Sequence, residues 1–265
     1  MKVNFGIDRI YSLSYDASIS KEVVEKSSKI VINDKEFTEK LLNRNYITTP
    51  HKVSDFPKEV SNLCFEVAGT CNVLITCNTI RRAIQVYRNL RNRGLTPILL
   101  HSQFTLHDRW LKLKTIGSAL SKKNAIVVST QVIEVGVNLD FDMLITDAAP
   151  IVSLVQRIGR VGRKIDRQSE ESFDIHVLYD VTQEGNELYS NVYPLDLTRQ
   201  TFEYIVKLRN EGKDILWRLS ASKEVNRKIP YNKISESIFQ RRTSYYNGEV
   251  GRILNVLLSP TTSSR

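Results

Sequence analysis

Short apolar runs rich in β-branched residues alternate with amphipathic segments through the middle of the chain. Between the runs, apolar positions recur at helical spacing, as in Ile80, Ala83, Ile84, Tyr87 and Leu90. Apolar strands that alternate with helices are typical of a parallel sheet covered on both faces. We therefore predict an α/β fold, with helices on both faces of a parallel sheet whose strands are NVLITC, TPILL, AIVVS, DMLIT and DIHVLYD.

The alternation is confined to part of the chain. Residues 1–56 show only a short strand at Ile30–Ile32, whereas residues 181–265 carry apolar positions at helical spacing near 202–208, 215–219 and 234–245. We divide the chain into an N-terminal segment (1–56), an α/β domain (57–180) and a small, mainly helical C-terminal appendage (181–265). Right-handed crossovers place the loops after the strands on one edge of the sheet, where we expect a site.

Charge and composition narrow the choice of function only slightly. The 265 residues include 38 Lys and Arg against 29 Asp and Glu, a net charge of +9 that is compatible with a nucleic-acid partner or with a solvated basic surface. Cys64, Cys71 and Cys77 form no C-x-x-C pair, so we expect core residues rather than a disulfide frame or a zinc cage. No apolar run suits a membrane span or a signal peptide, which favours the cytoplasm.

The octet QRIGRVGR at 156–163 is the most specific pattern in the chain. On a helix, Arg157, Arg160 and Arg163 would stack along one face, and Gly159 and Gly162 would let a ligand or a partner approach closely. Arginine suits a transferring phosphoryl group because its planar guanidinium binds phosphate oxygens and stays charged. The plain alternative is a solvated basic helix face.

Two further segments follow strand ends and suit phosphate groups of a nucleic acid. STQVIEVGVNLD begins at Ser129 and offers the Thr130 hydroxyl and backbone amides. TCNTIRR begins at Thr76 and enters a helix that Asn78 or Thr79 would cap whatever the function. Thr130 alone also reads as an ordinary helix cap, and Glu134 as a surface carboxylate.

In this order, the segments NTIR, HS, STQVIEVGVN and QRIGRVGR resemble those of the second RecA-like lobe of superfamily 2 helicases, over about residues 58–180. LLHSQFTLHDR and STQVIEVGVNLDFDMLITDAAP are similar to the helicase half of the CRISPR-associated helicase-nuclease of type I systems. That resemblance implies a RecA-like fold, with residues 1–56 in an inter-lobe position.

The resemblance also implies roles for individual residues in an ATP site. Arg160 and Arg163 match the arginine fingers that reach the γ-phosphate of ATP, and Gln156 matches the position that places the hydrolytic water. Gly136 and Asn138 match the motif that faces the nucleotide, where many relatives carry Asp instead of Asn. Arg157 is predicted to be structural.

On the nucleic-acid side, the same resemblance places four residues near the backbone of single-stranded DNA. These are Thr79, Arg81, Ser102 and Thr130. The implied partners are a first RecA-like lobe, a nuclease domain or subunit, single-stranded DNA and an RNA-guided surveillance complex, with no membrane.

The 265 residues contain no G-x-x-x-x-G-K-[ST] phosphate loop and no Asp-Glu motif for Mg²⁺. We therefore expect ATP to be shared with a first lobe that holds the Mg²⁺, and no activity from this chain alone, whether it is a fragment or a split subunit. No metal site is predicted, because the dipeptide His107-Asp108 lies inside the helicase-like segment. Alternatives are a lobe of a DNA-repair or RNA helicase of the same superfamily, and a non-catalytic nucleic-acid-binding module.

Overall fold

A computed structural model gives the fold of most of the chain. The structure describes residues 12–14, 29–31, 45–133, 139–163, 172–217, 228–231, 233–234 and 238. None of the helices in these ranges combines the length and the apolar composition needed to cross a bilayer.

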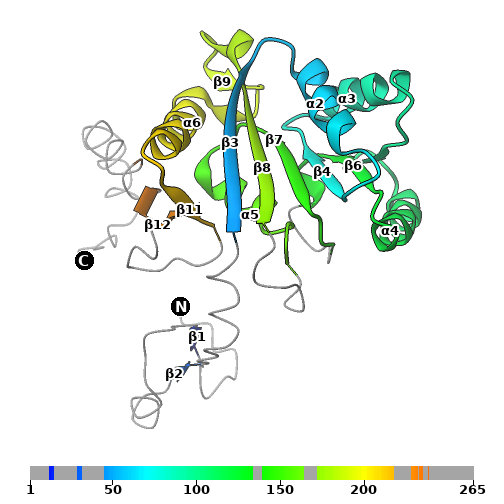
Figure 1. Cartoon of the computed structure of the whole chain (residues 1–265), viewed down its shortest axis with the longest axis horizontal. Coiled ribbons are helices and arrows are strands. Elements are labelled where there is room, and N and C mark those ends of the chain that lie inside the picture. Colours follow the sequence, from blue (N-terminus) through cyan, green and yellow to red (C-terminus); the bar gives the residue numbers. More distant parts are fainter. Residues whose placement is uncertain are drawn as a thin grey trace, which may run out of the picture.

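The central element is a parallel sheet of six strands. In chain order these are β3 (Asn45–Val53), β4 (Val73–Thr76), β5 (Ile98–Leu100), β6 (Ile126–Ser129), β7 (Met143–Asp147) and β8 (Ser172–Asp180). Their order across the sheet is β3-β8-β7-β4-β6-β5, and every neighbouring pair is parallel (Figure 1). All the strands that the apolar runs predicted are present, and the parallel direction is confirmed.

Helices cover both faces of this sheet, as predicted. α2 (Phe56–Val67) and α3 (Ile80–Asn92) pack on one face, where Val60, Cys64 and Leu90 are buried against β4, β6 and β7. α4 (Leu106–Ser121), α5 (Ile151–Ile158) and α6 (Leu195–Asn210) pack on the other face. On that face, α4 and α6 lie at the two ends of the strand order: α4 contacts the edge strand β5, and α6 contacts the edge strand β3 (Figure 1).

Polar side chains begin the helices on the sheet's carboxyl edge. Asp55 accepts a hydrogen bond from the Lys58 amide at the start of α2, and Thr79 accepts one from the Arg82 amide at the start of α3. Burial raises the pKa of the Cys64 thiol to about 12, so this cysteine is an inert core residue, as its sequence context predicted.

Shorter elements connect or flank this framework. They are β1 (Ser12–Ser14), β2 (Lys29–Val31), the 3-10 helices η2 (Gln131–Ile133) and η3 (Val181–Gln183), β9 (Leu188–Tyr189), β10 (Tyr193–Pro194), β11 (Asp214–Leu216) and β12 (Lys228–Pro230). β2 covers most of the strand predicted at Ile30–Ile32 and pairs with β1 in parallel.

The predicted boundary at residue 57 is wrong by one strand. β3 pairs with β8 in parallel over its whole length, from Asn45 opposite Ser172 to Val53 opposite Asp180. Its sequence, NYITTPHKV, mixes polar and apolar residues, and only Tyr46, Thr48 and Val53 are buried, since this strand lies at the edge of the sheet. That mixture hides the strand from a search for continuous apolar runs.

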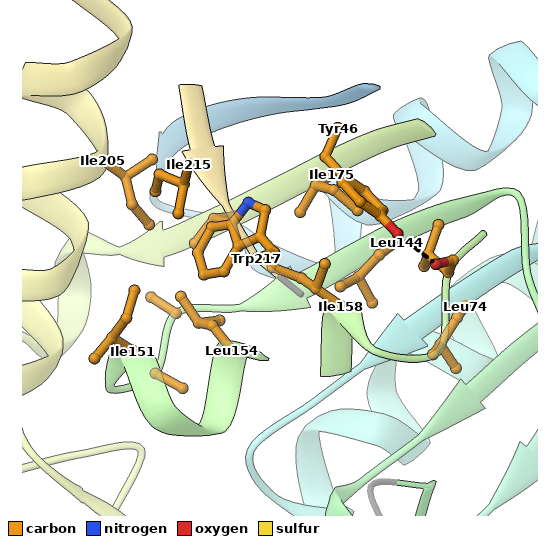
Figure 2. Close-up of a cluster of buried hydrophobic side chains, with 14 of the residues drawn as sticks. Tyr46, Leu74, Leu144, Ile151, Leu154, Ile158, Ile175, Ile205, Ile215 and Trp217 are labelled. Atoms are coloured by element: carbon orange, nitrogen blue, oxygen red, sulfur yellow. Dashed lines mark hydrogen bonds between the residues drawn. The ribbon is translucent and has the colours of Figure 1, made fainter. Parts of the chain in front are cut away.

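The segment after residue 180 packs against the sheet rather than standing apart from it. α6 is confirmed as a helix and lies against β3 and β8, but the helix predicted around Ile215 and Leu216 is the strand β11. Trp217 follows β11 and is 1% exposed; it inserts among Ile151, Leu154 and Ile205 (Figure 2). The sheet and this segment therefore share one core.

Candidate functional site

The arginine octet does not form one continuous helix. α5 ends at Ile158 with Gly159 as its C-cap, so Arg160 and Arg163 lie in the loop that follows. The predicted stack of three arginines on one helix face is wrong, because the glycine ends the helix between the first arginine and the second. Pro150 occupies the N-cap position of α5.

Arg157 is the buried member of the three and is structural, as predicted. Its side chain is 0% exposed, and its guanidinium donates to the Thr146 hydroxyl at 2.9 Å and to the Asp147 carbonyl at 3.0 Å. The other terminal nitrogen donates to Asn78 Oδ1 at 3.0 Å. A helical side chain points back toward the helix N-terminus, so Arg157 reaches the carboxyl ends of β7 and β4.

A second arginine belongs to the same buried network. Arg82 forms ion pairs with Asp147, at 2.8 Å, and with Asp180 at the end of β8. Burial alone would lower the pKa of Arg82, but the attraction of Asp147 and Asp180 raises it overall, so the charge is fixed. Its sequence neighbour Arg81 is exposed, so the two consecutive arginines of α3 lie in different surroundings.

Asp147 and Asn78 connect the two arginines, and sequence reasoning missed this role. Burial raises the pKa of Asp147, while Arg82, the Asn78 amide and Arg157 oppose that rise. The Asn78 backbone N–H donates to Asp147 Oδ2, and its side-chain amide donates to the Ala148 carbonyl. Because Asn78 Oδ1 also accepts from Arg157, both ends of its side chain are engaged inside the protein. The available signal was that Asp147 ends an apolar strand and Asn78 follows another.

The loop that carries Arg160 and Arg163 is held on several sides. The Phe141 amide donates to the Arg160 carbonyl, and the Gly162 amide donates to the Phe141 carbonyl, which forms a bridge beside the amino end of β7. Tyr46 on β3 donates its hydroxyl to the Val161 carbonyl at 3.2 Å, the dashed line of Figure 2. The backbone of the loop is therefore fixed by contacts from distant segments.

Two further contacts complete this clamp. The Arg163 amide donates to Asp140 Oδ1 at 2.6 Å, which joins the end of the STQVIEVGVNLD segment to the end of the arginine octet. Gly162 has φ +54°, and a Cβ atom there would lie 2.6 Å from the Phe173 ring. The close approach that requires this glycine comes from a side chain of the same chain, whereas we expected a ligand or a partner.

The residues predicted to contact nucleic acid gather at the opposite edge of the sheet, at the carboxyl ends of β4, β6 and β5. The Cys77 amide donates to the Ser129 carbonyl, and the Ser129 hydroxyl donates to the Leu100 carbonyl, so the three strand ends lie side by side. Gln131 donates to the Asn78 carbonyl and closes the row. Arg81 and Ser102 are exposed, Thr79 is half-buried, and Thr130 is only 3% exposed.

Of the residues predicted to face the nucleotide, Arg160 and Arg163 lie on the loop beside the amino end of β7. Asp140, the last residue of segment 129–140, contacts the same loop. Gly136, Asn138 and Glu134 belong to that segment and lie outside the described residues. Gln156 is exposed on α5, Arg163 is exposed, and Arg160 is half-buried.

Histidines form one notable pair. His51 on β3 and His176 on β8 approach to 2.9 Å between ring nitrogens, and burial lowers the pKa of His176 to about 4 with His51 lowering it further. Within the described ranges, no three His, Cys, Asp or Glu side chains gather as metal ligands would.

The family model and the related sequences that match this chain agree with one another. Residues 69–166 match the family described as CRISPR-associated nuclease/helicase Cas3, C-terminal. The CRISPR-associated endonuclease/helicase Cas3 of Escherichia coli (strain K12) is 32% identical over 145 residues, which cover 49% of this chain and 16% of that protein. The CRISPR-associated helicase Cas3 of Thermoproteus tenax is 29% identical over 189 residues, covering 70% of this chain and 30% of that protein.

Solved structures share the fold. T. fusca Cas3 with AMPPNP superposes with a TM-score of 0.54 at 24% identity, over 74% of this chain and 23% of that one. A chain of a CRISPR RNA-guided surveillance complex in a pre-nicking state gives a TM-score of 0.54 at 23% identity, over 74% of this chain and 25% of that one. The present chain therefore spans between 16% and 30% of the length of these relatives.

Residues 69–166 therefore resemble the C-terminal part of the CRISPR-associated nuclease/helicase Cas3. The parallel sheet with helices on both faces is the fold that the solved Cas3 structures share with this chain.

Proposed function

We propose that this lobe supplies Arg160 and Arg163 to ATP that is held mainly by the first lobe of a Cas3-type DNA helicase. What supports this role is the contrast within the octet: Arg157 is buried and committed to the core, whereas the other two arginines lie on a clamped loop. A fixed backbone keeps a guanidinium in place before the reaction, which is the arrangement that stabilises developing charge on phosphoryl oxygens.

The residues present suit the charge of a nucleotide triphosphate. Arginines at positions 160 and 163 offer planar donors for phosphate oxygens, and the exposed Gln156 carboxamide can orient a water or sense the opposite lobe. Gly136 and Asn138 would contribute backbone and amide contacts to the same nucleotide. The missing phosphate loop and Mg²⁺-binding carboxylates would come from the first lobe, so we expect this chain alone to be inactive.

At the carboxyl edge, we propose that single-stranded DNA passes over the ends of β4, β6 and β5. Arg81 and Ser102 are exposed there and would contact phosphates directly. Thr79 and Thr130 would shape the surface beneath them, since one caps α3 and the other is buried. DNA and nucleotide would then engage opposite edges of one rigid sheet.

The relatives' names suggest the remaining partners. They are described as nuclease/helicases, and one related chain belongs to an RNA-guided surveillance complex. We propose that this lobe acts with a first RecA-like lobe and a nuclease domain or subunit, on DNA presented by such a complex.

The test is DNA-stimulated ATP hydrolysis by this chain mixed with, or joined to, its first lobe. Arg163→Ala should lower the rate by about 10³-fold, the usual contribution of an arginine finger, without changing the melting temperature. Arg199→Ala, an exposed arginine on α6, is the matched control and should leave the rate unchanged.

Two outcomes would contradict the role in ATP hydrolysis. One is no gain in rate over the first lobe alone, and the other is an Arg163→Ala rate equal to that of the control. Either result, combined with intact DNA binding, would favour a non-catalytic nucleic-acid-binding module. A larger stimulation by RNA than by DNA would favour an RNA helicase of the same superfamily.

A further inference from the structure

α4 presents an unusual surface for a helix that covers a sheet. Leu106 is 78% exposed and Trp110, one turn later, is 51% exposed. Leu111 is exposed beside them, while Ile116 on the inner side of the helix is buried in the core. Large apolar side chains that face solvent together indicate a binding surface more often than isolated ones do.

Cations are interleaved with these aromatic and apolar side chains. The Lys114 ammonium lies 3.5 Å from the centre of the Trp110 ring, and the Lys112 ammonium lies 4.3 Å from the centre of the Phe104 ring. His107 stacks on Trp110 with ring centres 6.3 Å apart, and His101 stacks on Phe104 at 4.2 Å. The surface thus combines flat π faces with positive charge.

The charge around this helix is one-sided. Residues 101–124 contain five Lys or Arg side chains and a single carboxylate, Asp108. That carboxylate already accepts a hydrogen bond from the Thr105 hydroxyl. The Asp108 backbone N–H in turn donates to the same hydroxyl oxygen. An acidic occupant would therefore meet little repulsion here.

From these observations we propose that α4 carries a base-stacking platform for single-stranded DNA, centred on Trp110 and flanked by Lys112 and Lys114. The platform rests on the function proposed above and extends its DNA path, because α4 begins at Leu106, shortly after the exposed Ser102 at the carboxyl edge. Proteins that bind single strands without sequence preference use this pairing of aromatic faces and basic side chains.

Lys114 covers one face of Trp110 in the absence of a ligand. An ammonium over an exposed ring is held weakly, whereas a stacked base and a phosphate contact are each stronger. A DNA strand would draw Lys114 to a phosphate and take its place on the ring. Sequence preference should be small, since every base has a π face.

The two tryptophans make the test direct, because Trp110 is exposed and Trp217 is buried. Titrating the whole chain with fluorescein-labelled oligodeoxythymidylate should give binding by anisotropy, and the unlabelled oligomer should quench the tryptophan emission. Trp110→Phe should abolish the quenching, and Trp110→Ala should weaken binding about tenfold. Removing Lys112 and Lys114 together should lower the slope of log affinity against log salt by about 1.4.

Phe65 on α2 provides a matched control. It is 57% exposed and lies under Arg93, at 5.0 Å, on the opposite face of the sheet. Phe65→Ala should leave the affinity for the oligomer unchanged. This comparison separates a specific platform from a general effect of removing an exposed aromatic side chain beside a cation.

An affinity unaffected by Trp110→Ala, or emission unchanged when the oligomer is saturating, would overturn the platform. If Arg81→Ala weakens binding and Trp110→Ala does not, the platform is wrong while the proposed function stands. If Trp110→Ala weakens binding while Arg163→Ala leaves ATP hydrolysis intact, the platform stands and the proposed arginine role fails. If Trp110→Ala leaves DNA binding intact but weakens association with the first lobe, α4 is a protein interface and the proposal is overturned.

Discussion

Arg157 and Arg163 belong to the same short motif, yet they lie in opposite surroundings. Arg157 is enclosed by Thr146, Asp147 and Asn78, whereas Arg163 is exposed at the end of the clamped loop. The spacing of the motif singled out its three arginines but could not show which of them is buried. That difference depends on where Gly159 ends α5 and on which distant strands lie beneath the helix.

Removing Arg157 should destabilise the fold rather than affect chemistry alone. Arg157→Ala leaves buried polar groups of Thr146 and Asn78 without their donor, so the free energy of unfolding should fall by about 3–5 kcal/mol. Urea denaturation would measure it. Gln156→Ala, at the exposed neighbouring position, should change stability by less than about 0.5 kcal/mol; equal effects at both positions would contradict the buried network.

Two glycines differ in whether the structure requires them: Gly162 has no room for a side chain, whereas Gly117 has. Gly162→Ala must place a methyl group against the Phe173 ring at a positive φ, so we expect a loss of about 3 kcal/mol. Gly117→Ala, inside α4 with no atom within 4 Å of the new Cβ, should stabilise the chain by about 0.5–1 kcal/mol. Thermal melts of both variants would decide, and a neutral Gly162→Ala would contradict the packing described here.

At the scale of elements, the sequence predicted the buried strands well and the edge strand poorly. β4, β6 and β7 are buried along their whole length and carry continuous apolar runs. β3 was missed because it is an edge strand that mixes polar and apolar residues and contains no continuous apolar run. β11 was predicted as a helix since its apolar residues are too few to show a period.

The β3–β8 pairing carries a pH dependence through His51 and His176. Folding lowers the pKa of both rings below 6.5, and that of His176 to about 4, mainly by burial. As the pH falls from 6.5 to 4, the two histidines bind protons in the unfolded chain before they do so in the folded chain. The free energy of unfolding is therefore highest above pH 6.5 and decreases over this range. We expect a loss of about 2 kcal/mol, allowing for partial exposure of the pair.

Denaturation at several pH values would measure this loss of stability. The double variant His51→Gln, His176→Gln should no longer show the loss. The control His107→Gln, at an exposed position on α4, should show the same loss as the unmodified chain. A pH profile unchanged in the double variant would show that other groups carry the dependence.

At the scale of the whole molecule, the segment after residue 180 completes the lobe. Trp217 donates its indole N–H to Thr48 on β3 at 3.1 Å and packs in the same core as α5 and α6. The sequence located the motifs but not this contact, because the short apolar run around Trp217 does not show which distant strand it packs against.

Trp217→Ala should therefore destabilise the entire lobe by about 3–5 kcal/mol. Far-UV circular dichroism and Trp110 fluorescence should report one coincident unfolding transition at a lower denaturant concentration. A separate early transition, with the sheet intact, would mean that the segment is an independent appendage.

The buried network of Arg157, Arg82 and Asp147 has a mechanical consequence. It fastens α5, α3 and the ends of β4, β7 and β8 at a single point, and a slide of any one of them would break several charged hydrogen bonds at once. In the function proposed above, a force applied at residues 160–163 would reach the carboxyl edge of the sheet with little internal deformation. The domain would then move as a rigid body.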